Sequence, residues 1–413
     1  MKLLRAILIA SSILLAAAPS RAQSFALVGG TIYTDPDATP VRDGVVLVEN
    51  GTIRAVGPRK TTQIPRGTRT INCSGLTVMA GFWNSHVHFT ERKWANAATI
   101  PADELSAQLE AMLTRWGFTS VFDTGSMWDN TRRIRDRIDA GEIAGPRIRS
   151  TGEILIPPGA ATPTLVYDVM GTMHVTLPEV ATEAEGRETA RRLLDAGTDG
   201  IKLYAQTFAP PILVLAPAAI RGAVDEAHRR GKLVFAHPSN RDGLMNAVRG
   251  GADILVHTTP QTGPWTDAVI DEMLAARVTI IPTLKLWRHE LRHDRGSLRD
   301  RVTGVGVGQL RAWHARRGPI IFGTDVGYMD DYDPGDEYAL MAEAGLDYRA
   351  ILATLTTAPA ARFGASNLGR IVPGATADIT VLQSDPARDD RAFANVAFTI
   401  RNSTTIYRAA DVR

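Results

Sequence analysis

The stretch GFWNSHVHFTE, residues 81–91, decides which fold the sequence favours. His86 and His88 lie two residues apart, so in a β-strand both side chains project from one face and can bind a metal ion through neutral imidazole nitrogens. A single His-x-His pair is weak evidence, because many such pairs lie on protein surfaces. This pair closes a strand-like run that follows a β-rich segment. That position favours a pair of metal ligands at the end of a parallel strand.

Strand-like runs alternate with amphipathic helix-like segments along the chain, which is typical of βαβ units and a parallel sheet. We count eight such runs: 76–88 (LTVMAGFWNSHVH), 118–125 (FTSVFDTG), 146–152 (PRIRSTG), 200–204 (GIKLY), 232–237 (KLVFAH), 253–257 (DILVH), 278–283 (VTIIPT) and 319–325 (PIIFGTD). The helices expected between several of them cover 103–117, 185–197, 217–231, 266–278 and 348–356. The sequence therefore predicts an α/β fold with a (β/α)8 TIM barrel over residues 79–365.

The two ends of the chain have a different, β-rich character. Residues 25–78 contain short strand-like runs broken by Gly-Gly, Asp-Gly and Asn-Gly, and Asn50-Gly51 is a hairpin signal. The same character returns at 369–383 (GRIVPGATADITVLQ) and near the C-terminus. We expect residues 23–78 and 366–413 to combine into one small β-sandwich that flanks the barrel.

The first 22 residues have the pattern of a secretory signal peptide. Lys2 and Arg5 precede an apolar run from Ala6 to Ala18. Ser20 and Ala22 then supply small residues at the minus-three and minus-one positions of a cleavage site after Ala22. The apolar run is short for a membrane span of about 20 residues, so an uncleaved anchor is the weaker alternative. The sequence thus predicts an exported protein, periplasmic or secreted, with no membrane attachment after cleavage.

The composition limits the partners that can be expected. The chain has 413 residues with 46 basic and 44 acidic side chains, a formal net charge of +2. This balance gives no electrostatic reason to expect nucleic acid or an anionic membrane, and it favours a small-molecule substrate. Cys73 is the single cysteine, so no disulfide can form within the chain. The sequence leaves open whether the protein forms a homo-oligomer.

Lys202 lies between apolar Ile201 and Leu203 in the fourth strand-like run, so its side chain is expected to point into the barrel. A buried ammonium group is costly, and one interpretation requires a carboxylate partner. The other interpretation is that burial and nearby cations depress the pKa of the lysine. The neutral amine can then add carbon dioxide, and the resulting carbamate can bridge two metal ions.

Three further residues end strand-like runs where a barrel would place ligands. His237 and His257 close the fifth and sixth runs, about one βα unit apart. Either alone could be a hydrogen-bonded core histidine, but two in succession favour ligands of a second ion. Asp325 closes the eighth run, where it can hold a metal ion and accept a proton from bound water.

These residues together resemble the amidohydrolase superfamily, in its branch with two metal ions bridged by a carboxylated lysine. The order His-x-His, Lys, His, His, Asp on strands one, four, five, six and eight matches that pattern. The stretches 41–57 and 369–382 also resemble its split β-module. The chain looks most like the imidazolonepropionase-related group, which includes prolidase-like enzymes. MAGFW (79–83) departs mildly, since the family usually has Pro before this glycine.

The resemblance implies two divalent ions, with zinc as the default for imidazole and carboxylate ligands. It assigns six side chains to them: His86, His88 and Asp325 to the more buried ion, His237 and His257 to the more exposed ion, and Lys202, as its carbamate, to both. A water shared by the ions would be hydroxide near neutral pH and would attack a substrate carbonyl. Asp325 would act as the general base and pass the proton to the leaving amine.

Other residues are candidates for substrate contact. Tyr204, two residues after Lys202, could donate its hydroxyl to a developing oxyanion or simply fill the barrel mouth. Arg288 and Arg292 follow the seventh strand and could bind a substrate carboxylate, although a solvated charged stretch is the plainer interpretation. His174, in a long segment expected to act as a lid, and Tyr328 are further candidates.

The sequence therefore predicts a metal-dependent hydrolase that cleaves an amide C–N bond in a small substrate such as a dipeptide, an N-acyl amino acid or a cyclic amide. A lactonase or a phosphotriesterase is the alternative with the same metal centre. A non-catalytic binding protein on the barrel fold is an alternative of another class. All six ligand positions are filled, which favours an enzyme.

Overall fold

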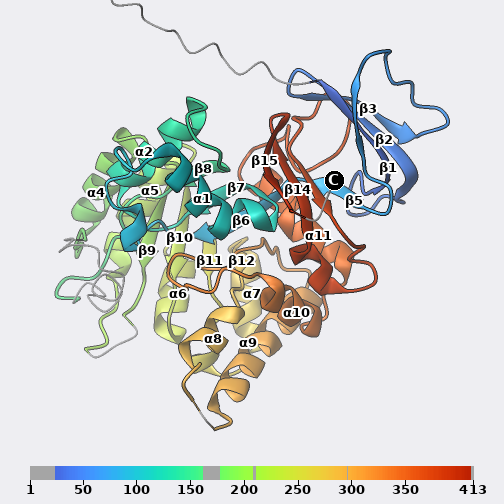
Figure 1. The fold of residues 1–413 in the computed structure, drawn as a ribbon. Helices are drawn as coiled ribbons and strands as arrows, with labels where there is room; N and C mark the ends of the chain where they lie inside the picture. The colour runs from blue at the N-terminus through green and yellow to red at the C-terminus, as the bar shows by residue number, and fades with distance from the viewer. Residues whose placement is uncertain (1–23, 161–176, 208–210, 295, 411–413) are drawn as a thin grey trace, which may run out of the picture.

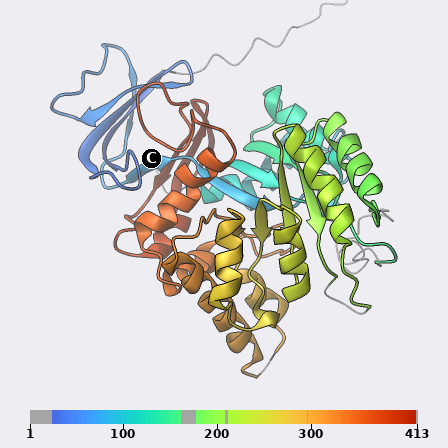
Figure 2. The same ribbon diagram turned by 180° about the vertical axis from the view of Figure 1, so that it is seen from behind.

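The structure, a computed structural model, describes residues 24–160, 177–207, 211–294 and 296–410. Parallel strands surrounded by helices form the larger part, and a separate sheet lies beside them, which confirms the predicted α/β fold class. The blue N-terminal strands and the red C-terminal strands lie side by side at one flank (Figure 1), and the reverse view agrees (Figure 2). The predicted signal peptide lies outside the described residues.

The barrel strands pair in parallel, in the orders β6-β7-β8 and β9-β10-β11-β12. Their bounds are β6 (Phe82–Val87), β7 (Phe118–Asp123), β8 (Arg147–Ser150), β9 (Gly200–Tyr204), β10 (Leu233–His237), β11 (Ile254–Val256) and β12 (Thr279–Ile281). Three parallel bridges join the remaining neighbours: Leu155–Leu203, Ile280–Ile320 and Val87–Val326. The eighth predicted run also accepts a hydrogen bond from β6, from Ser85 N to Phe322 O at 2.8 Å. These contacts complete the ring.

Helices cover the outside of the barrel strands (Figure 2). Their bounds are α1 (Ala102–Met112), α2 (Trp128–Asp139), α4 (Glu183–Asp195), α5 (Pro217–Arg229), α6 (Arg241–Arg249), α7 (Asp267–Ala275), α8 (Lys285–Glu290), α9 (Leu298–Ala315), α10 (Gly335–Glu343), α11 (Tyr348–Leu355) and α12 (Thr357–Arg362). Helix α4 begins where the Thr182 hydroxyl accepts from Glu185 N and the Glu185 carboxylate accepts from Thr182 N. This capping box satisfies backbone donors at the first turn.

Short 3-10 helices occur at Arg92–Trp94, Thr114–Trp116, Pro260–Thr262 and Asp390–Ala394. No helix among the described residues combines the length and apolar character needed to cross a membrane.

Neighbouring residues of several barrel strands belong to different hydrophobic clusters, as Ile280 and Ile281 do in β12. Ile201 and Leu203 pack in the outer cluster together with helix residues, so Lys202 between them faces the barrel interior, as predicted. Phe122, Phe235 and Phe363 belong to an inner cluster. The centroid of the Phe122 ring lies 4.6 Å from that of Phe235 and 5.0 Å from that of Phe363. We call this inner cluster the aromatic plug, because it fills the barrel interior as layers of side chains do in this architecture.

The flanking sheet contains eight strands from both chain ends, in the order β15-β14-β13-β5-β1-β2-β3, with β4 paired to β1. Their bounds are β1 (Phe25–Ile32), β2 (Val41–Glu49), β3 (Thr52–Pro58), β4 (Arg69–Asn72), β5 (Thr77–Ala80), β13 (Ile379–Leu382), β14 (Val396–Arg401) and β15 (Thr404–Arg408). Buried residues of both ends share one core, which includes Phe25 and Phe398. The β-module built from both ends is therefore confirmed, and its strands form one continuous sheet.

The run 76–88, predicted as one barrel strand, divides at Gly81 between two sheets. β5 pairs with β13 in the flanking sheet, and barrel strand β6 begins at Phe82. A Cβ atom at Gly81 would lie 2.2 Å from Thr119 Oγ1 on β7, so only glycine lets the backbone pass this closely. The first barrel strand is thus shorter than predicted.

Candidate metal centre

A cavity of about 390 Å³ opens at the C-terminal ends of the barrel strands. The structure brings all the predicted metal-binding residues into its lining: His86, His88, Lys202, His237, His257 and Asp325. They come from five different strand ends, far apart in the sequence, because a parallel barrel collects those ends at one rim. Their role as ligands remains a prediction, and their convergence is an observation.

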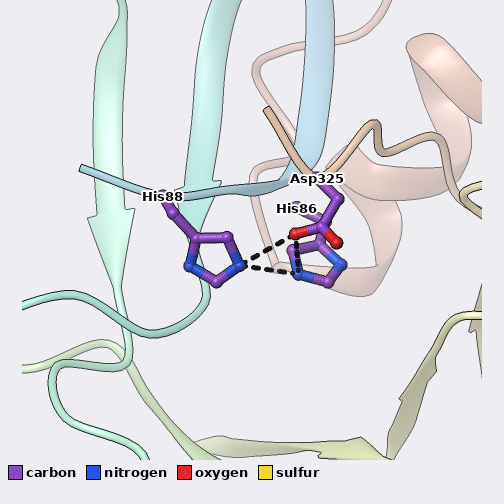
Figure 3. Close-up of side chains that lie close together, drawn as sticks. All are labelled: His86, His88 and Asp325. Atoms are coloured by element: carbon purple, nitrogen blue, oxygen red, sulfur yellow. Dashed lines mark hydrogen bonds and ion pairs between the residues drawn. The ribbon is translucent and has the colours of Figure 1, made fainter. Parts of the chain in front are cut away.

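His86, His88 and Asp325 form the tightest group in the cavity (Figure 3). Asp325 Oδ1 lies 3.0 Å from His88 Nε2 and 3.2 Å from His86 Nε2, and the two Nε2 atoms are 3.1 Å apart. His86 is fully buried and Asp325 is nearly so. Burial, followed by the charge of Lys202, keeps the pKa of His86 well below its ordinary value, so its imidazole is neutral.

The chemistry of this group fits a metal ion. Asp325 Oδ1 is buried and accepts no hydrogen bond from the described residues, although two imidazole nitrogens point toward it. Such a convergence of electron-pair donors is costly without a cation, because a buried carboxylate needs a compensating partner. Neutral imidazoles and a carboxylate are the ligand types that zinc and related ions bind. The residues present therefore suit a divalent ion.

His88 is oriented from behind by the loop after β7. Its Nδ1 lies 3.1 Å from the carbonyl oxygen of Gly125, so Nδ1 carries the proton and Nε2 faces Asp325. The Asp123 carboxylate accepts from Gly125 N at 3.3 Å and from Ser126 Oγ at 2.6 Å. Burial raises the pKa of Asp123, and the hydrogen bonds and His88 oppose this effect. Asp123 thereby holds the loop that fixes His88.

His257 has a similar support that the sequence interpretation missed. Its Nδ1 lies 2.6 Å from the hydroxyl of Thr283, two residues after β12, and its Nε2 lies 3.9 Å from Asp325 Oδ2. Thr283 has a φ of 43°, and His257 and Asp325 have φ values of 76° and 65°. A β-branched residue with positive φ is strained, and such strain persists where the surroundings impose it. The place of Thr283 at a strand end was the available signal.

The remaining predicted ligands lie beside this group. The His237 and His257 ring centroids are 4.6 Å apart, and the Tyr204 ring stacks on His237 at 4.3 Å. Lys202 is 2% exposed. Burial lowers its pKa to about 7, while Asp325 and Asp123 oppose the shift. A substantial neutral fraction of this amine is therefore expected near neutral pH.

The predicted substrate contacts divide into two groups. Tyr204 and Tyr328 line the cavity. Arg288 and Arg292 do not: the Arg288 guanidinium lies 3.4 Å from Asp336, and exposed Arg292 donates to the backbone oxygen of His289 at 2.8 Å. This arrangement gives the predicted carboxylate clamp no support, because both guanidinium groups are directed to other parts of the chain. His174 lies outside the described residues.

The cavity walls above the ligands are largely apolar. Helix α8, after the seventh strand, contributes Leu286 and Trp287, and Ile154, Leu177 and Val302 come from other segments. Trp287 is held in place because its Nε1 donates to Thr258 Oγ1 at 2.9 Å. A concave apolar chamber with a few polar groups at its floor is typical of a small-molecule site.

A barrel rim with clustered histidines and a carboxylate is the arrangement of a metal-binding hydrolase. The chain belongs to the amidohydrolase family, which it matches over residues 77–406. The predicted superfamily is thus confirmed, and with it an amidohydrolase enzyme.

Individual relatives are distant but cover most of the chain. The ochratoxinase of Aspergillus niger is 23% identical over 403 aligned residues, covering 86% of this chain and 81% of that protein. A provisionally named prolidase from Bifidobacterium longum is 26% identical, with a TM-score of 0.78 over 94% of this chain and 95% of that one. A Xaa-Pro dipeptidase with bound methionine in its active site is 20% identical, with the same TM-score over 94% and 100% of the two chains. At 20% identity, the similarity to the Xaa-Pro dipeptidase shows a shared fold.

Proposed function

We propose that this amidohydrolase cleaves the amide bond of a small, largely apolar substrate, such as a dipeptide, an N-acyl amino acid or a cyclic amide. The observation that carries the proposal is the convergence of six potential ligands at the floor of an apolar cavity. The names of the relatives, a prolidase, a Xaa-Pro dipeptidase and an ochratoxinase, support an amide substrate.

The proposal places two divalent ions, zinc by default, at this floor. His86, His88 and Asp325 would hold one ion, and His237 and His257 the other. Lys202, as its carbamate, would serve both, which its burial and its lowered pKa favour. When bound, such ions lower the pKa of water toward neutrality and polarise a carbonyl group.

The protein's own groups have separate tasks in the proposed reaction. Asp325 would accept the proton of the attacking water and deliver it to the nitrogen of the leaving amine. Tyr204, held against His237, would donate its hydroxyl to the carbonyl oxygen as negative charge develops there. The apolar walls would exclude bulk water and thereby strengthen both interactions.

Steady-state kinetics on a mixed panel tests the proposal. The purified enzyme, loaded separately with Zn²⁺, Mn²⁺ or Co²⁺, is assayed on N-acyl amino acids, dipeptides, cyclic amides, lactones and organophosphates of similar size. We expect the largest kcat/KM on an amide, and loss of that activity on chelation with recovery on adding metal. A larger kcat/KM for a lactone or an organophosphate would contradict the proposal, and absence of turnover would favour a binding protein.

We further propose that the mature enzyme is exported, because Lys2, Arg5 and the apolar run from Ala6 to Ala18 precede small residues at Ala22. The protein is purified from separated cell fractions of a host that recognises such signal peptides. N-terminal sequencing is expected to show that the exported chain begins at Gln23. A chain that keeps Met1 and stays in the cytoplasmic fraction would contradict export.

A further inference from the structure

One side of the cavity carries an acidic group that the proposed reaction does not use. Glu290, the last residue of α8, is exposed and lines the cavity. The hydroxyl of Tyr328, which also lines the cavity, donates to Glu290 Oε1 at 2.6 Å. Tyr328 follows Asp325 by three residues, and its backbone N donates to Asp325 O at 3.3 Å. The pair therefore bridges the eighth strand end and α8.

The Glu290–Tyr328 pair is connected to Asp325 through the backbone of Tyr328. The Tyr328 hydroxyl is the donor in the hydrogen bond between the two side chains, which leaves the negative charge of the pair on Glu290. The negative group therefore lines the same cavity as Asp325.

Basic side chains do not balance this charge within the described lining of the cavity. Lys202 is the one lysine among those lining residues, and arginine does not occur among them. Arg288, two residues before Glu290, is directed toward Asp336 instead. Lys285, at the start of α8, donates to the backbone oxygens of Asp331 and Asp333 at 3.0 and 2.6 Å. These two cations are thus committed to other groups, and exposed Arg292 donates to the backbone oxygen of His289.

This arrangement has a consequence for the substrate. A free carboxylate brought to the α8 side would face Glu290 without a compensating lysine or arginine in the described lining, and like charges repel. An ammonium or an N–H group would instead find an acceptor in the carboxylate. A neutral apolar group would pack on Leu286 and Trp287 of the same helix.

We propose that Glu290, held by Tyr328, is a specificity determinant that selects amides whose group on the α8 side is neutral or cationic and disfavours free carboxylates there. The proposal rests on the proposed amide hydrolysis and narrows its substrate class. Since Glu290 is exposed, screening by solvent limits its effect to about 3- to 10-fold per charge change.

A matched substrate series tests this in the metal-loaded enzyme. The series is one N-acyl amino acid as the free acid, as its methyl ester, and as the analogue with an aminomethyl group in place of the carboxyl. The wild type should favour the amine and the ester over the acid in kcat/KM. Glu290→Gln, which keeps an acceptor for Tyr328, should reduce the preference for the amine over the acid about 3- to 10-fold, and Glu290→Lys should reverse it. Asp300→Asn, an exposed position on α9 outside the cavity lining, is the control and should change nothing.

A binding measurement separates this proposal from the proposed function. Calorimetry gives the Kd of 3-phenylpropylamine and of 3-phenylpropionate for the wild type and the two Glu290 variants, whether or not any amide is cleaved. A shift of the amine-to-acid affinity ratio toward the acid in both variants supports the proposal. A ratio that the variants leave unchanged, or an amine that does not bind at all, overturns it. Failure of amide turnover with a shifted ratio would reject the hydrolase function alone.

Discussion

Glu337 is a fully buried carboxylate on α10 that supports the helix beside the cavity. Its Oε2 accepts a hydrogen bond at 2.7 Å from the backbone N of Lys285, the first residue of α8. Its Oε1 is buried and has no hydrogen-bond partner among the described residues. Burial raises the pKa of Glu337 from 4.5 to about 7, although the backbone donors and Lys285 oppose the shift. The protein is thus expected to carry a proton there that the unfolded chain releases.

The sign and size of the effect on stability follow from this difference. Below pH 4.5 the carboxyl is protonated in both states, and above pH 7 it is ionised in both, so the folded state loses stability as pH rises through this window. At about 1.4 kcal/mol per pH unit, the interval from 4.5 to about 7 corresponds to about 3 kcal/mol. Glu337→Gln removes the ionisation. The difference in free energy of unfolding between this variant and the wild type should therefore be about 3 kcal/mol more favourable to the variant at pH 8 than at pH 4.5.

Urea unfolding of the metal-free wild type and Glu337→Gln between pH 4.5 and pH 8 measures this gain. Metal-free protein is used because ligand protonation would otherwise change metal occupancy across the same range. Glu343→Gln, an exposed position on the same helix, is the matched control and should track the wild type. A stability difference between Glu337→Gln and the wild type that stays constant across the pH range would refute the reasoning.

The proposed metal centre gives three further predictions. Lys202→Ala should lose metal by elemental analysis and reduce kcat/KM more than about 100-fold, with partial recovery on adding short carboxylic acids; unchanged turnover would remove Lys202 from the mechanism. Asp325→Asn should keep part of the metal and lower kcat by about 100- to 10,000-fold, and a wild-type rate would exclude Asp325 as the base. Thr283→Val should weaken binding of the metal ion assigned to His237 and His257 by about 10- to 100-fold in chelator competition, whereas Thr283→Ser should leave this affinity unchanged. Equal affinities in the two Thr283 variants would show that its hydroxyl does not orient His257.

The positions of the ligand candidates could be predicted because they depend on simple geometry. Each of His237, His257 and Asp325 ends an apolar run, and a parallel barrel brings such ends to one rim whatever the loops do. The inward direction of Lys202 followed from the alternation of side chains along a strand. These inferences needed local patterns and a single architectural rule.

The rest depended on tertiary contacts that leave no local pattern. The charged stretch after the seventh strand gave no sign that Arg288 would be directed to Asp336 while Glu290 lines the cavity. The hydrogen bond from His257 to Thr283 joins two strand ends that are 26 residues apart. The split of the run 76–88 at Gly81 was hidden for the same reason, because the close approach of Thr119 comes from another strand. Side-chain partners across strands are set by packing and not by spacing.

The aromatic plug fills the barrel interior behind the candidate metal centre. Phe122, Phe235 and Phe363 close the route toward the far end of the barrel, and interiors packed in this way do not let ions through. Trp287 and Tyr328 line the cavity above the candidate ligands. Under the proposed function, a substrate seated between them would slow the escape of bound ions as well as the entry of water, so metal exchange would be slower during turnover than in the empty enzyme.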